Sequence, residues 1–69
     1  MKYKEEKIAS FQLEKQRWQL LKITNELNLE NYQIRKNRKV LTNCKWIGTA
    51  KQRFATIISN ELNQLNLFN

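Results

Sequence analysis

The chain has no proline and a single glycine, Gly48, so almost nothing in its 69 residues forces the backbone out of regular structure. Gly and Pro are the residues that most strongly interrupt helices and strands. The first third is rich in Glu, Lys, Gln, Leu and Arg, which have high helix propensity. The sequence therefore predicts an all-α fold of three helices in one small domain, residues 1–69.

Apolar residues over positions 3–27 recur at helical spacing on two opposite faces. One face holds Ile8, Phe11, Trp18 and Leu21. The other repeats every seven residues, as Leu13, Leu20 and Leu27. A helix that is apolar on two sides must be buried on two sides, and a chain this short buries only about 60% of its unfolded surface. We therefore expect a homodimer that forms through Leu13, Leu20 and Leu27.

A second helix is predicted near the C-terminus, over residues 49–65. Thr49 follows Gly48 and is a suitable N-cap. The apolar residues of this segment fall on a single stripe, which comprises Ala50, Phe54, Ile57, Ile58, Leu62 and Leu65. One such stripe is typical of a helix that packs on one side against its own domain.

The middle of the chain, residues 31–42, has two interpretations. A short helix is the first. A β-hairpin is the alternative, because Tyr32, Ile34, Lys36, Arg38 and Val40 alternate around Asn37. Asn-Gly or Asp-Gly, the dipeptides that favour tight hairpins, are absent here, so the short helix is preferred.

The stretch from Leu20 to Lys36 resembles the helix-turn-helix motif of DNA-binding proteins. Thr24 stands where the motif has a small residue, Asn28 where the turn needs positive φ, and Ile34 where the second helix is anchored. The resemblance covers about 20 residues and implies a recognition helix. Gln33 and Arg35 would then meet base edges, and Tyr32 and Lys36 would meet phosphates.

The distribution of charge also indicates a nucleic-acid partner. Thirteen Lys and Arg outnumber six Glu, and no acidic residue lies between Glu30 and Glu61. An uncompensated basic block attracts polyanions. The sequence therefore predicts a small nucleic-acid-binding regulatory protein of phage or plasmid type, with DNA favoured over RNA. The predicted contact residues are Tyr32, Gln33, Arg35, Lys36, Arg38, Lys39, Lys45, Lys51 and Arg53.

Two other functions fit the same composition. A small basic protein can inhibit or modulate a host protein that handles nucleic acid, as anti-CRISPR, anti-restriction and polymerase-modulating proteins do. Association with RNA or the ribosome is the third interpretation. Nuclease sensitivity of the bound partner distinguishes the host protein from either nucleic acid.

Catalysis and cofactor binding are not expected. The chain has no His or Asp and one Cys, Cys44, so it lacks a set of catalytic or metal-binding residues and cannot form an intrachain disulfide. Cys44 is predicted to be a small core residue. The free thiol, the lack of a long apolar run and the absence of a signal-peptide core predict a cytoplasmic protein of a bacterial host.

The two tryptophans, Trp18 and Trp46, are predicted to lie in the core or at an interface. Stacking on a nucleobase would require exposure beside the basic block. Trp46 follows Lys45 directly and is the better candidate for that role.

Overall fold

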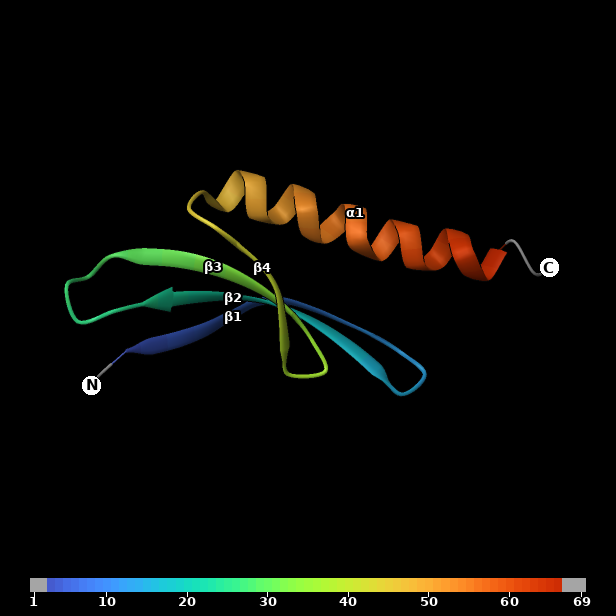
Figure 1. Cartoon of the computed structure of the whole chain (residues 1–69), viewed down its shortest axis with the longest axis horizontal. Coiled ribbons are helices and arrows are strands. Elements are labelled where there is room, and N and C mark those ends of the chain that lie inside the picture. Colours follow the sequence, from blue (N-terminus) through green and yellow to red (C-terminus); the bar gives the residue numbers. More distant parts are fainter. Residues whose placement is uncertain (1–2, 67–69) are drawn as a thin grey trace.

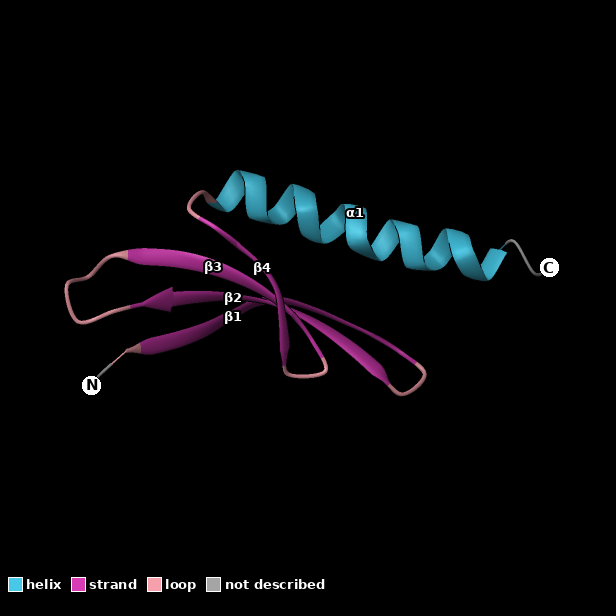
Figure 2. Cartoon of the chain, viewed as in Figure 1, coloured by secondary structure: helices cyan, strands magenta, loops and turns pink. Residues whose placement is uncertain are grey.

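The computed structural model describes residues 3–66, and the side chains of residues 3–64. Four strands, β1 (Lys4–Leu13), β2 (Gln16–Thr24), β3 (Glu30–Lys36) and β4 (Lys39–Cys44), precede one helix, α1 (Ile47–Asn66). The strands form an antiparallel sheet in the order β1-β2-β3-β4, and α1 lies across one of its faces (Figures 1 and 2). The fold is α+β, so the predicted all-α, three-helix and helix-turn-helix architectures are wrong.

The predicted first helix is instead a hairpin of β1 and β2. The chain reverses at Glu14 and Lys15, which places Phe11 directly opposite Trp18 in the strand register. Their ring centroids are 5.8 Å apart. Seven residues is two turns of a helix, but it is also the separation of two residues that pair across a tight turn. The spacing alone therefore could not distinguish the two structures.

Side chains that alternate between the two faces of the sheet along β2 explain the two apolar faces that the sequence had indicated for a helix. Trp18 and Leu20 are fully buried on the face that α1 covers, and Leu21 points to the opposite face because side chains alternate along a strand. We call that opposite face the open face of the sheet. A single strand can bury apolar residues on both sides, so no second chain is needed to explain the pattern.

The middle of the chain is the hairpin of β3 and β4 and not the preferred short helix. Asn37 and Arg38 occupy its two-residue turn with φ of 52° and 77°. Positive φ at both central positions is the signature of the primed turns that match the twist of paired strands. Asparagine tolerates this conformation, whereas arginine adopts it at a cost.

The residues that resemble a helix-turn-helix motif form part of another hairpin. Thr24 ends β2, Ile34 is buried in β3, and Asn28 lies in the connecting loop with φ of 62°. The expectation of positive φ at Asn28 is thus confirmed, although in a different structure. Asn25 closes the loop, because its side-chain oxygen accepts hydrogen bonds from the backbone of Leu27 and Leu29.

The C-terminal helix is confirmed. It begins two residues before the predicted Thr49, and its first turn is closed by a hydrogen bond from the Ala50 amide to the Trp46 carbonyl. Ala50 is fully buried, Phe54 and Ile57 are half-buried, and the stripe becomes exposed at Leu62. The side chain of Leu65 lies outside the described part of the chain.

The core lies between α1 and the face of the sheet that it covers. The buried residues that form it are Leu20, Tyr32, Ile34, Cys44 and Ala50. Cys44 is 6% exposed, which confirms the prediction of a small core residue. Within residues 3–66, no helix is both long enough and apolar enough to span a bilayer.

Candidate nucleic-acid interface

Two turns that are distant in sequence meet at one end of the sheet. In an antiparallel meander, the β1–β2 and β3–β4 turns lie at the same end, and the β2–β3 loop lies at the other (Figure 1). The first end carries four cationic residues, which we call the basic end: Lys15, Arg17, Arg38 and Lys39. Four of the six glutamates lie near the opposite end, and they are Glu5, Glu6, Glu26 and Glu30. Lys4, Lys7 and Lys22 also lie towards that opposite end, which is therefore nearly neutral, whereas the basic end stays net positive even with Glu14 counted.

A shallow hollow of about 440 Å³ lies at the basic end. Three cationic side chains and three amides line it, and no carboxylate does: Lys15, Arg17, Arg38, Gln12, Gln19 and Asn37. Gln19 and Arg17 alternate with Trp18 and therefore belong to the open face. Cations and amide groups are the side chains that bind phosphate oxygens, so the lining is suited to an anion. Glu14, in the same turn as Lys15, is exposed and lies outside the lining.

The two turns are joined by hydrogen bonds. The backbone amide of Arg17 donates to the side-chain oxygen of Asn37 at 2.9 Å, and the Asn37 amide donates to the Arg17 carbonyl at 2.9 Å. The β3–β4 turn is thereby tied to β2, so the cations of both hairpins are held on one scaffold.

Ion pairs leave the basic end unneutralised. In the described part of the chain, Lys22 lies 2.8 Å from Glu30, Arg35 lies 3.3 Å from Glu5, and Lys36 lies 4.0 Å from Glu61. The pKa of Lys22 is raised, first because it donates a hydrogen bond to Glu30 and then because of the charge of that carboxylate. None of these pairs involves a residue of the basic end.

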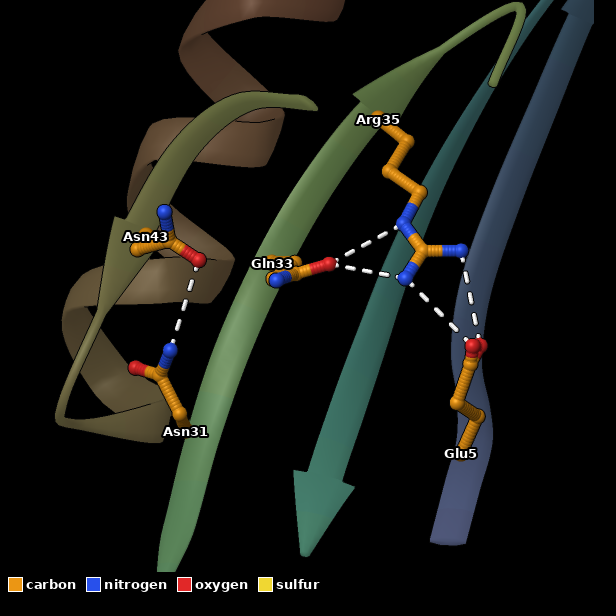
Figure 3. Close-up of polar contacts among 5 residues, drawn as sticks. All are labelled: Glu5, Asn31, Gln33, Arg35 and Asn43. Carbon is orange, nitrogen blue, oxygen red and sulfur yellow. Dashed lines mark hydrogen bonds and ion pairs between the residues drawn. The ribbon is translucent and has the colours of Figure 1, made fainter. Parts of the chain in front are cut away.

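Arg35 and Gln33, two of the predicted contact residues, lie on the open face and bind each other. The Arg35 guanidinium donates to the Gln33 side-chain oxygen at 2.8 and 3.0 Å, and it also reaches Glu5 on β1 (Figure 3). The contact with Glu5 crosses β2 diagonally at Leu21, which is 7% exposed although no helix covers this face. Arg35 therefore shields an apolar residue and is neutralised by a carboxylate.

Tyr32 and Lys36 face α1 and not the surface expected for them. Tyr32 is 7% exposed and belongs to the core. The Lys36 ammonium lies 5.2 Å from the centroid of the Trp18 ring, and it is also near Glu61 of α1. A cation held over an aromatic face and beside a carboxylate contributes less to an external positive field.

The remaining predicted contacts are exposed but fall into two places. Arg38 and Lys39 belong to the basic end, whereas Lys45, Lys51 and Arg53 lie in the β4–α1 connection and the first turns of α1. Arg53 donates a hydrogen bond to the Thr42 hydroxyl at 3.3 Å. Trp46, beside Lys45, is 72% exposed, so it lies outside the core, and its predicted place at an interface stays a prediction.

Lys15 and Arg17 were missed from the sequence. They lie in the first 30 residues, where basic and acidic residues are mixed, and only the hairpin separates them from Glu5, Glu6 and Glu26. A turn-forming residue at position 14 or 15 would have indicated the β1–β2 hairpin. Glu and Lys are not residue types that favour turns, so the sequence carries no such signal there.

Leu13, Leu20 and Leu27, the predicted dimer interface, do not form one surface. Leu20 is fully buried in the core, Leu13 is half-buried at the end of β1, and Leu27 is 77% exposed in the β2–β3 loop. The helical stripe that supported the homodimer therefore does not exist. The homodimer itself stays a prediction.

Comparison with known proteins identifies no relative: no family model, curated protein or solved structure matches the chain. The residues that the structure describes also contain no cluster of three His, Cys, Asp or Glu side chains that could hold a metal ion.

Proposed function

We propose that the protein binds nucleic acid, DNA foremost, through the basic end of its sheet. One observation carries the proposal: two separate hairpins bring three cations, Lys15, Arg17 and Arg38, to one hollow, and the described ion pairs involve none of them. Like charges repel, so a fold gains nothing for its own stability from gathering them. A polyanion is the partner that such a surface would attract.

Phosphate contacts explain the chemistry of the hollow. Arg17 and Arg38 can each donate two parallel hydrogen bonds to a phosphate, and Lys15 supplies a compact charge. The side-chain amides of Gln12 and Gln19 can donate to further oxygens. Such contacts position a nucleic acid by its backbone and carry no sequence information by themselves. Recognition by a helix inserted in the major groove is not part of this proposal.

Chemical-shift mapping of the backbone amides tests the proposal. We expect a short DNA titrated into labelled protein to shift amides of residues 15–19 and 37–39 most, and those of residues 25–29 least. Shifts spread evenly over the surface, or confined to the β2–β3 loop, would contradict an interface at the basic end. If DNA and RNA both leave the spectrum unchanged at low salt, an acidic surface of a host protein becomes the better partner.

A further inference from the structure

Among the described side chains, residues 3–64, Trp46 is the most exposed aromatic residue. It is 72% exposed, whereas Trp18 is fully buried. It follows Lys45, and its carbonyl accepts the first hydrogen bond of α1, so its backbone is fixed at the start of the helix. An indole that is exposed to solvent beside a cation is a suitable platform for a planar ligand.

Two exposed apolar side chains of β4 lie next to the basic end. β4 is an edge strand that starts at Lys39 and ends just before Lys45. Val40 and Leu41 are each 44% exposed along it. Six residues of strand span roughly 20 Å. The edge therefore has a cation at each end, with Val40 and Leu41 next to Lys39 and the polar residues Thr42 and Asn43 nearer to Lys45.

A single strand of nucleic acid fits this edge better than a duplex. Unpaired bases expose their faces, which can stack on an indole or lie on aliphatic groups, whereas the bases of a duplex are stacked on each other. A second copy of the chain fits less well. Full antiparallel pairing of two β4 strands would bring Lys39 of one copy near Lys45 of the other, and like charges in that position destabilise a sheet.

We propose that β4 and the β4–α1 connection bind single-stranded nucleic acid, with Trp46 stacking on an unpaired base. The proposal rests on the nucleic-acid binding proposed above, and it adds the strandedness and the stacking residue. The phosphates would contact Lys39 and Lys45. Glu30 lies at the same end of the sheet as Trp46, but it is paired with Lys22 at 2.8 Å.

The test compares Trp46→Ala and Trp46→Phe in the full chain, with a 20-nucleotide oligothymidylate and a duplex of equal length as probes. Loss of one base stack should weaken oligothymidylate binding roughly 5- to 150-fold in Trp46→Ala. Trp46→Phe should recover most of the affinity, and duplex binding should change little. Leu27→Ala, which shortens another exposed apolar side chain, is the matched control and should bind as wild type does.

Fluorescence gives an independent measurement. Oligothymidylate should quench the emission of the wild type, and it should leave the emission of Trp46→Phe, which retains only the buried Trp18, unchanged. If Trp46→Ala binds both probes as wild type does while Lys15→Ala/Arg38→Ala binds weakly, the inference is wrong and the proposed function stands. If wild type binds neither probe, both are wrong. If Trp46→Ala only dissociates a dimer, the exposed edge is an interface between copies and the inference is overturned.

Discussion

Arg17 and Asn37, which are 20 residues apart, are joined by two reciprocal hydrogen bonds of 2.9 Å, and this pair joins the two hairpins at the basic end. Asn37 is suited both to accept the hydrogen bond and to occupy the turn. Its side chain accepts the Arg17 amide, and its backbone adopts a φ of 52° that most residues disfavour. The turn residue of one hairpin thereby fixes the position of the cations of the other.

Asn37→Ala should lower the free energy of unfolding by about 1–3 kcal/mol, because it removes a hydrogen bond and places a β-carbon at positive φ. Urea denaturation measures the change. Asn63→Ala, at an exposed position of α1, is the control and should change stability by less than about 0.5 kcal/mol. Equal stability of the two variants would show that the link between the hairpins contributes nothing.

Arg38→Gly and Arg38→Ala should separate stability from binding. Both remove one cation of the basic end and should weaken DNA binding equally. Only Arg38→Gly relieves the φ of 77° and creates the Asn-Gly turn, so it alone should raise the free energy of unfolding, by about 1 kcal/mol. Thermal denaturation and DNA titration of both variants check this. A glycine variant that is more stable and binds as wild type does would exclude Arg38 from the interface.

Leu20 and Leu27 should differ sharply in their effects on stability. Leu20→Ala leaves a cavity in the core and should cost about 2–5 kcal/mol of unfolding free energy. Leu27 is 77% exposed, so Leu27→Ala should cost less than about 0.5 kcal/mol. Urea denaturation of both variants measures the contrast. Similar losses of unfolding free energy in the two variants would support the predicted helix with Leu20 and Leu27 on one face, which the structure excludes.

The contribution of Lys22 to stability should depend on pH. Its pKa is raised in the folded chain, chiefly by the hydrogen bond to Glu30, so the charged form favours folding. That contribution is complete below the ordinary lysine pKa and is lost as pH rises through the raised value. The difference in melting temperature between wild type and Lys22→Met should therefore shrink at strongly alkaline pH. In a Glu30→Gln background, which removes the partner of Lys22, the same comparison should show no such trend.

The sequence predicted the C-terminal helix, the burial of Cys44 and the need for positive φ at Asn28. The β3–β4 hairpin was the second of the two interpretations of residues 31–42, after the short helix. The first hairpin could not be recognised, because Phe11 and Trp18 are spaced as both a helix and a tight hairpin allow. Helix propensity over residues 3–27 favoured the wrong choice, since pairing and burial in the sheet override it.

The candidate site was predicted only in part. Arg38 and Lys39 were found because the acid-free stretch contains them, and Lys15 and Arg17 were missed because glutamates surround them in sequence. Arg35 and Lys36 belong to the same acid-free stretch, yet Glu5 and Glu61 reach them from other elements. Charge along a sequence cannot show such neutralisation, because it depends on which strands and helices become neighbours.

The salt dependence of DNA binding tests the central claim most directly. Each phosphate contact contributes about −0.9 to the slope of log affinity against log salt for duplex DNA, and about −0.7 for single strands. Lys15→Ala/Arg38→Ala should therefore flatten the slope by up to about 2 units and weaken binding at low salt. Lys4→Ala/Lys7→Ala removes the same charge away from the basic end and should keep the slope of the wild type. Equal slopes for both double variants would contradict binding at the basic end of the sheet.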